Sequence, residues 1–157
     1  MGQLIPYAFL KDQEMTDRKD DVSQLKKLGG ENKARYDNPN VDILETFPNQ
    51  YPEGDYRIEF VYNEYTSLCP RTGQPDHATI TIRYSPDKEC IETKSLKFYL
   101  QAYRNHQSFM ETNTNKILND LVYVVNPQWM HIEAEFTPRG GIKSTIFAYY
   151  GKENSYE

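Results

Sequence analysis

The hydrophobic period of this chain changes twice, and this change constrains the fold more than any other feature. From residue 56 polar and apolar side chains alternate, then apolar side chains recur every three or four residues, and then alternation returns. A period of two indicates a strand with one buried face, and a period near 3.6 indicates an amphipathic helix. The alternating segments are YRIEFVY (56–62), ATITIRY (78–84), MHIEAEF (130–136) and, more weakly, KSTIFAYY (143–150). The helical segments are SLKFYLQAYRNH (95–106) and TNTNKILNDLVYVV (112–125).

The predicted order of elements is therefore strand, strand, helix, helix, strand, strand (ββααββ). We expect an α+β fold in which an antiparallel four-stranded sheet carries two helices on one face. The other sheet face is polar, so it faces water or a lumen between subunits. Thr112 or Thr114 is expected to cap the second helix, and Asn126-Pro127 ends it.

The first third of the chain shows little sustained period. Residues 1–54 are rich in charge, Asn, Pro and Gly, so we expect a partly extended N-terminal arm, with a short helix near residues 22–28. A partner subunit is expected to order this arm. The catalytic domain then covers residues 55–157.

Charge and apolar patterning exclude several classes of function. The net charge is −5, which argues against a nucleic-acid-binding protein, and an anionic ligand needs a local basic patch. We find neither a transmembrane segment nor a signal peptide, so no membrane partner is expected. The two cysteines lie 21 residues apart and fit neither a disulfide framework nor a CxxC metal pattern, so a cytoplasmic location is expected.

The loop SLCPRTGQPD (67–76) contains the first candidate for chemistry. Pro70, Gly73 and Pro75 enforce turns around Cys69. A thiolate is the reactive form of cysteine, so Cys69 is either an activated nucleophile or a buried, inert thiol. Asp76 follows seven residues later and is either a general acid beside this thiol or a residue that caps a turn.

Two basic segments are candidates for binding phosphate. In ETKSLK (92–97), Lys94 and Lys97 lie on one face of a helix start, where unpaired N–H groups favour anions. In PRGG (138–141), Arg139 suits bidentate phosphate contact. The alternatives are an ordinary capped helix end and an exposed arginine in a hairpin turn.

Glu111, at the junction of the two helices, is a carboxylate that can accept paired N–H donors from a planar heterocycle, or an acid that interacts with the helix dipole. The cysteines and histidines lack the spacing of metal ligands, so no metal is expected. Cys90 has no obvious acid partner and is interpreted as structural.

These motifs occur together in one family. The chain resembles the single-domain, NADPH-dependent 7-cyano-7-deazaguanine reductases, which are nitrile reductases of queuosine biosynthesis, a tRNA-modification pathway. The resemblance runs from about Tyr56 to Gly151. The matching segments are SLCPRTGQPD (67–76), ETKSLKFYL (92–100), YRNH (103–106), Phe109 to Glu111, NDL (119–121) and FTPRGG (136–141).

The resemblance implies a tunnelling fold that assembles into an oligomeric barrel, with active sites between subunits. It implies that Cys69 attacks the nitrile carbon to form a thioimide, that Asp76 protonates the nitrogen, and that two NADPH molecules complete the reduction to an aminomethyl group. Glu111 and His106 are the substrate-binding candidates. The residues assigned to NADPH are Glu92, Thr93, Lys94, Ser95, Lys97, Arg139 and Gly140.

One departure from the family pattern affects the substrate site. The family has FHE where this chain has FME, so Met110 replaces a histidine that would position the substrate. His77 or His106 is left to take over that role, or the base is bound less well. The competing hypotheses are a thioimide-forming amidinotransferase, a pterin-type cyclohydrolase of this fold, and a non-catalytic purine-binding assembly protein.

Overall fold

The structure is a computed structural model that describes residues 20–26 and 36–152. Its regular elements are η2 (Val41–Ile43), β1 (Thr46–Pro48), β2 (Ile58–Leu68), β3 (Pro75–Ser85), β4 (Glu89–Ile91), α1 (Thr93–Gln101), α2 (Met110–Val125), β5 (Trp129–Phe136) and β6 (Thr145–Tyr150).

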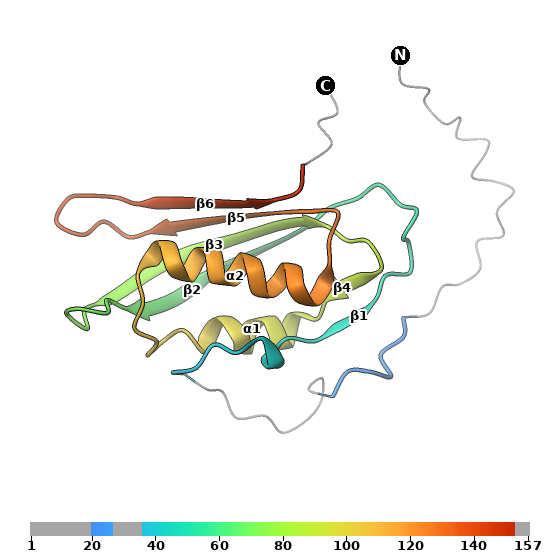
Figure 1. The fold of residues 1–157 in the computed structure, drawn as a ribbon, viewed down its shortest axis with the longest axis horizontal. Helices are drawn as coiled ribbons and strands as arrows, with labels where there is room; N and C mark the ends of the chain where they lie inside the picture. Colours follow the sequence, from blue (N-terminus) through green and yellow to red (C-terminus); the bar gives the residue numbers. More distant parts are fainter. Residues whose placement is uncertain (1–19, 27–35, 153–157) are drawn as a thin grey trace, which may run out of the picture.

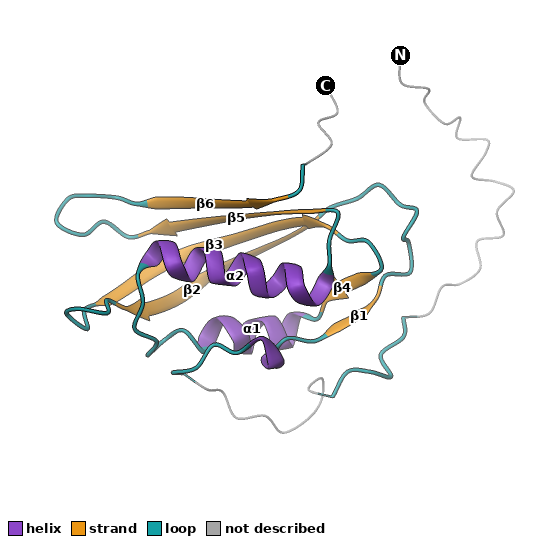
Figure 2. Ribbon diagram, viewed as in Figure 1, coloured by secondary structure: helices purple, strands orange, loops and turns teal. Residues whose placement is uncertain are grey.

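Four long strands form one antiparallel sheet in the order β2-β3-β5-β6. Both α-helices cover the same face of this sheet (Figures 1 and 2), with α1 over β2 and α2 over β5 and β6. The predicted α+β fold, with two helices on one face of a four-stranded sheet, is confirmed.

The core lies between the helices and the alternating inward residues of the sheet. Ile80 and Ile82 of β3 and Ile132 of β5 are almost completely buried, and Leu121 of α2 packs against them in the same cluster. Each such side chain contributes about 1.5–3 kcal/mol when removed from water. On the opposite face Arg83 bridges Glu59 at 2.5 Å and Glu133 at 3.2 Å, so this face is polar, as predicted.

Strand β2 contains a bulge that the alternating pattern did not predict. Tyr62 pairs with Ile80, but the next paired residue, Tyr65, faces Ala78, so β2 has one extra residue here. Side chains alternate between the two faces of a strand, so the extra residue changes which positions of β2 face the helices, from even-numbered to odd-numbered residues. Beyond the bulge, Tyr65 and Ser67 point to the helix side and are buried.

Part of the predicted arm belongs to the domain. Strand β1 pairs antiparallel with β4 to form a second, two-stranded sheet, and neither strand was predicted. Leu44, two residues before β1, is buried in the core. Residues 20–26 form a turn and no helix, and the rest of the helix expected near residues 22–28 lies outside the described residues.

Helix α2 begins earlier than predicted. Its N-cap is Phe109, and Thr112 and Thr114 lie within the helix, so the expected threonine cap is wrong. The Thr114 hydroxyl instead donates back to the Met110 carbonyl at 2.8 Å. The predicted end is confirmed, because Asn126 has the left-handed φ of 43° typical of a residue that stops a helix.

Candidate functional site

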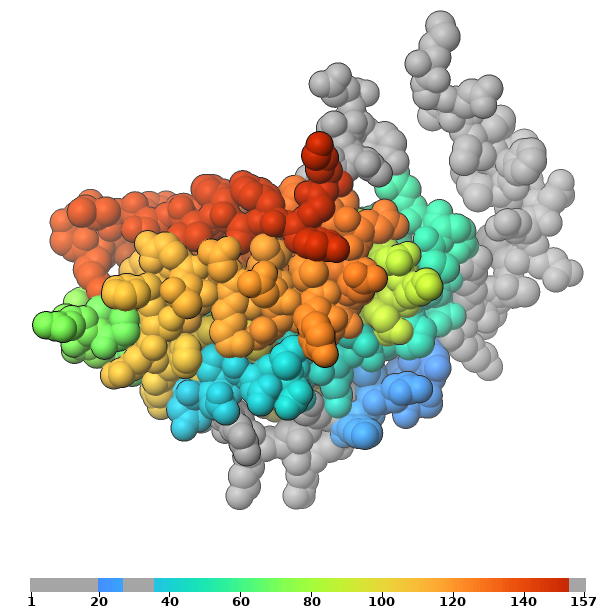
Figure 3. Space-filling view, viewed as in Figure 1, coloured from blue at the N-terminus to red at the C-terminus, as the bar shows by residue number. Residues whose placement is uncertain are grey.

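Three segments that are distant in sequence meet at one end of the sheet. They are the β2–β3 turn, the α1–α2 loop with the start of α2, and the β5–β6 turn, which lie together at the left of Figure 1 and Figure 3. Leu68 binds the α1–α2 loop through two backbone hydrogen bonds, to the His106 carbonyl at 3.0 Å and from the Ser108 N–H at 3.1 Å. Thr137 binds the His77 carbonyl at 2.9 Å, which ties the end of β5 to β3.

Cys69 sits in a closed turn at this junction. Its N–H donates to the Gln74 carbonyl and its carbonyl accepts from the Gly73 N–H, both at 2.9 Å. The Thr72 hydroxyl lowers the pKa of Cys69 most, followed by the backbone N–H groups of Thr72 and Arg71, so the pKa falls to about 7. A partly exposed thiol with a lowered pKa is the environment of a reactive cysteine.

Asp76 lies on the adjacent strand, opposite Ser67 in the register. Its side chain is only 5% exposed and forms an ion pair with the Arg139 guanidinium. Burial raises the pKa of Asp76, while Arg139 and then His77 act in the opposite direction. Arg139 also lowers the pKa of Cys69, so one cation lies close to both predicted catalytic residues.

A group of buried polar side chains lies behind Asp76, and sequence reasoning did not identify it. The Tyr65 hydroxyl, the Ser67 hydroxyl and both amide atoms of Asn113 are buried, and none has a hydrogen-bond partner among the residues that the structure describes. Ser67 and Asn113 lie close enough to Tyr65 to affect its pKa, which burial raises. The bulge in β2 is the feature that turns Tyr65 and Ser67 toward this group.

The predicted substrate-binding residues lie beside the Cys69 turn. Glu111 is exposed in the first turn of α2, next to Met110, which is half-buried. His106 is half-buried and packs edge-on against the ring of Tyr103. Burial, followed by the charge of Lys116, lowers the pKa of His106.

The predicted phosphate segment starts away from the Cys69 turn, where β4 leads into α1 (Figure 1). Glu92 is the N-cap of α1, and its carboxylate accepts from the N–H groups of Lys94 at 2.8 Å and Ser95 at 2.6 Å. The protein's own carboxylate thus occupies the N–H groups that were expected to attract a phosphate. Both Glu92 and Ser95 are buried, whereas Thr93 and Lys97 are exposed.

The two ammonium groups of this segment lie around one aromatic ring. Lys94 Nζ is 6.0 Å and Lys97 Nζ is 5.1 Å from the centre of the Phe98 ring. The Phe98 ring therefore brings both cations to one place on α1.

Arg139 and Gly140 lie at the Cys69 end, away from these lysines. Arg139 and Ile142 exchange backbone hydrogen bonds at 2.9 and 3.0 Å across Gly140 and Gly141, which have φ of 58° and 80°. Positive φ at both central positions characterises a tight hairpin turn and explains the glycine pair. The predicted site residues of one chain thus form two separate groups, one around Cys69 and one at the start of α1.

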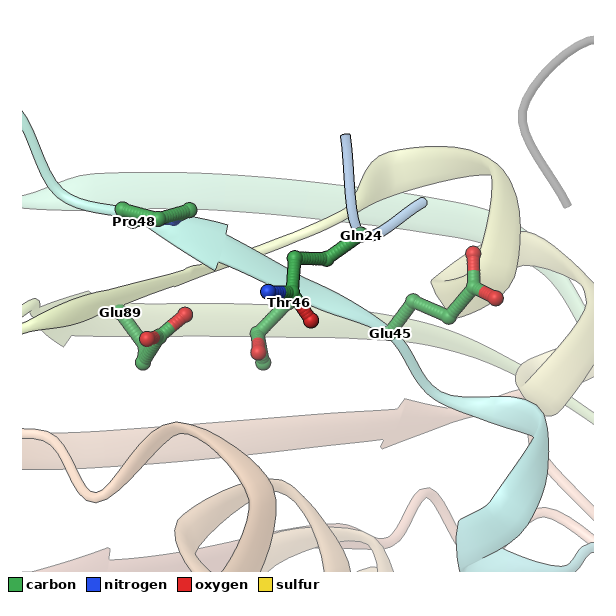
Figure 4. Close-up of a pocket in the computed structure, with 5 residues that line it drawn as sticks. All are labelled: Gln24, Glu45, Thr46, Pro48 and Glu89. Atoms are coloured by element: carbon green, nitrogen blue, oxygen red, sulfur yellow. The ribbon is translucent and has the colours of Figure 1, made fainter. Parts of the chain in front are cut away.

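A pocket of about 330 Å³ lies over β1 and β4 (Figure 4). Gln24, Glu45, Thr46, Pro48 and Glu89 line it. Its two carboxylates make it unsuitable for a phosphate, and it does not include the Cys69 turn.

The described residues contain no group of three or more His, Cys, Asp or Glu side chains arranged to hold a metal ion. No helix in the described part is long and apolar enough to cross a membrane.

Comparisons with known proteins agree on one family. The family model described as QueF-like protein matches residues 75–155. Proteins from several bacteria that are named NADPH-dependent 7-cyano-7-deazaguanine reductase are similar to this chain. The one from Nitratidesulfovibrio vulgaris is 46% identical over 88% of this chain and 85% of its own length. The one from Desulfovibrio desulfuricans is 48% identical over 91% and 87%, and the one from Neisseria meningitidis is 50% identical over 80% of each.

One solved structure has a similar fold. The crystal structure titled as the archaeosine synthase QueF-Like in the apo form matches with a TM-score of 0.55 and 18% identity, over 62% of this chain and 94% of that chain.

Proposed function

The chain belongs to the family of NADPH-dependent 7-cyano-7-deazaguanine reductases, and we propose that it reduces the nitrile of 7-cyano-7-deazaguanine to an aminomethyl group in queuosine biosynthesis. The enzyme is an oxidoreductase, and NADPH supplies a hydride in each of the two reductions of this reaction. The observation that carries the proposal is the activated Cys69 beside the ion pair of Asp76 and Arg139.

Cys69 is the proposed nucleophile, because its pKa of about 7 makes a large fraction of the thiolate available at neutral pH. It attacks the nitrile carbon and forms a thioimide, which divides a difficult four-electron reduction into separate steps. Asp76 is the proposed proton donor to the nitrile nitrogen. Burial raises its pKa, so the carboxylate can take up a proton and deliver it to the nitrogen.

Glu111 is the proposed reader of the base. Its exposed carboxylate stands in the first turn of α2, and this helix start lies beside the Cys69 turn. A carboxylate can accept two N–H groups from the pyrimidine edge of a deazaguanine. Met110 offers no comparable group, and His106 remains a further candidate for substrate contact.

Lys94 and Lys97, together with Thr93, are the proposed contacts of the NADPH phosphates. Two cations at one place on α1 suit such a polyanion, whereas the pocket over β1 and β4 is acidic. Glu92 and Ser95 support this site from within, because they form the cap that fixes the start of α1.

We further propose that an active site combines residues from two copies of the chain. Lys94 lies in the first turn of α1, a helix roughly 13 Å long from its nine residues, whereas the Cys69 turn lies near the loop that follows this helix. Strands β2 and β6 are the two edges of the sheet, and β6 exposes Phe147 and Tyr149. Edge strands pair readily with another chain. A cytoplasmic location is part of the proposal, because the reaction needs a reduced Cys69.

Incubation with 7-cyano-7-deazaguanine alone tests the chemistry. We expect intact-mass spectrometry to show a covalent adduct, which disappears in Cys69→Ala. Adding NADPH should then oxidise NADPH and release the amine. An adduct without NADPH oxidation would contradict the reductase and favour the amidinotransferase, and an adduct on Cys69→Ala would show that the nucleophile is wrong.

Mixing of two inactive variants tests the shared site. If the site combines two copies, Cys69→Ala and the double variant K94A/K97A should regain part of the activity when they are mixed, dissociated and reassembled. If each chain contains a complete site, the mixture should stay as inactive as its components.

A further inference from the structure

A closed hairpin turn positions Arg139 beside the Cys69 turn. The hairpin turn from Arg139 to Ile142 closes through two backbone hydrogen bonds of 2.9 and 3.0 Å. From this turn the guanidinium contacts the Asp76 carboxylate and lies 3.5 Å from the Pro75 carbonyl oxygen. An arginine of this chain that is engaged with this carboxylate is not available to a phosphate at the start of α1.

Arg139 affects the charge environment of both proposed catalytic residues, Cys69 and Asp76. Asp76 faces Arg139 and His77, and the neutral hydroxyl of Tyr65 lies on its buried side. Cys69 faces the Thr72 hydroxyl, the backbone N–H groups of its own turn and Arg139. Arg139 is thus the cation common to both environments.

The ion pair with Arg139 requires Asp76 to be an ionised carboxylate, whereas a proton donor must carry a proton. We infer, on the basis of the proposed nitrile chemistry, that Arg139 is a positioning residue that holds Asp76 ionised beside Cys69, so that Asp76 first accepts the thiol proton and then returns it to the nitrile nitrogen.

The proposed step balances without any further reactant. The S–H bond of Cys69 breaks, and its proton moves to the Asp76 carboxylate. The thiolate attacks the nitrile carbon, so that a C–S bond forms and one π bond of the nitrile breaks. Asp76 then gives the proton to the nitrogen and returns to its ion pair with Arg139. The product is the thioimide, and the net proton change is zero.

The protonation equilibria support this sequence. The donors of the turn lower the pKa of Cys69 to about 7, and burial raises the pKa of Asp76. The two values move toward each other, and proton transfer is easiest between groups of similar pKa. Without Arg139, the pKa of Asp76 would rise further, and Asp76 would retain its own proton to higher pH.

Formation of the adduct without NADPH separates this role from cofactor binding. For Arg139→Gln we expect adduct formation to slow by roughly tenfold or more. We also expect the acid limb of its pH profile, which reports ionisation of Asp76, to move to higher pH. Arg139→Lys should restore part of the rate, because it restores the charge without the planar fork. Lys143→Gln, which removes a cation from the same hairpin and breaks an exposed 3.0 Å pair with Glu135, is the matched control and should react like the wild type.

Two results would overturn the inference. One is an unchanged adduct rate and pH profile in Arg139→Gln together with a raised KM for NADPH, which would make Arg139 a cofactor ligand. The other is equal loss in Arg139→Gln and Lys143→Gln, which would indicate a general effect on the hairpin. If the wild type forms no adduct, the proposed function fails separately. Alkylation of Cys69 by iodoacetamide then still decides whether Arg139 acts on the thiol, because its pH midpoint must rise in Arg139→Gln.

Discussion

Glu92 and Ser95 cap the start of α1 through hydrogen bonds to each other. The Ser95 N–H donates to the Glu92 carboxylate at 2.6 Å, and the Ser95 hydroxyl donates to the Glu92 carbonyl at 2.8 Å. Ser95 also accepts from the Glu45 N–H at 2.9 Å, which attaches the segment before β1 to the helix. These two residues of the ETKSLK motif therefore have a structural role, which separates them from Lys94 and Lys97 of the same motif.

Glu92→Ala should destabilise the fold. It removes the acceptor of two backbone N–H groups, and the loss of an N-cap costs about 0.5–2 kcal/mol. Urea unfolding followed by circular dichroism measures the change. Glu111→Ala is the control, because it removes an exposed acid from the first turn of α2 and should cost less. Equal effects of the two substitutions would contradict the capping role.

Lys97→Gln should raise the KM for NADPH several-fold and leave adduct formation with the nitrile unchanged. The side chain is exposed, so its loss should hardly affect the free energy of unfolding. Steady-state kinetics with varied NADPH, and adduct formation by mass spectrometry, provide the two measurements. A slower adduct with an unaltered KM would place Lys97 in the chemical step instead.

The reactivity of Cys69 should depend on the Thr72 hydroxyl. Only the thiolate reacts with iodoacetamide, so the rate rises with pH through the pKa of Cys69, and we expect a midpoint near pH 7 in the wild type. Thr72→Val removes the largest lowering influence, so its midpoint should move up toward the ordinary pKa of about 8.5. An unshifted midpoint would mean that the backbone of the turn alone activates the thiol.

Two buried tyrosines should respond in opposite ways to the loss of their hydroxyl. The Tyr65 hydroxyl has no hydrogen-bond partner in the described part of the chain, so Tyr65→Phe should leave the free energy of unfolding unchanged or raise it by up to about 1 kcal/mol. The Tyr99 hydroxyl bonds to Tyr103 at 2.8 Å and to Asp120 at 2.7 Å, so Tyr99→Phe should lower it by about 1–3 kcal/mol. Urea unfolding of both variants gives the comparison. A similar loss in both would show that Tyr65 has a partner.

The hydrophobic period was sufficient to predict the long elements, because burial of one face dominates their energy. It was insufficient for β1 and β4, since three-residue strands are too short to show a period and form only through their mutual pairing. The start of α2 was misjudged for a related reason. Hydrogen bonds between Leu68 and the α1–α2 loop determine where the chain enters the helix, and a scan for capping residues does not include such tertiary contacts.

The sequence suggested candidate residues for the site but not how they are arranged. Cys69 and Asp76 follow from one loop sequence, because the turn and the strand pairing are local. The contact between Asp76 and Arg139 joins residues 63 positions apart, and no local pattern contains it. The same holds for Asn113, which appears as an ordinary helix residue until the bulge in β2 turns Tyr65 toward it.

The bulge between Tyr62 and Tyr65 also affects how relatives of this chain should be aligned. A relative that lacks one of the two residues between them would have a regular strand with Tyr65 two positions after Tyr62, so Tyr65 and Ser67 would still face the helices. An alignment that places the resulting gap after Leu68 would instead assign Tyr65 and Ser67 to the polar face. The position of the extra residue therefore decides which residues of β2 are compared with one another at this end of the sheet.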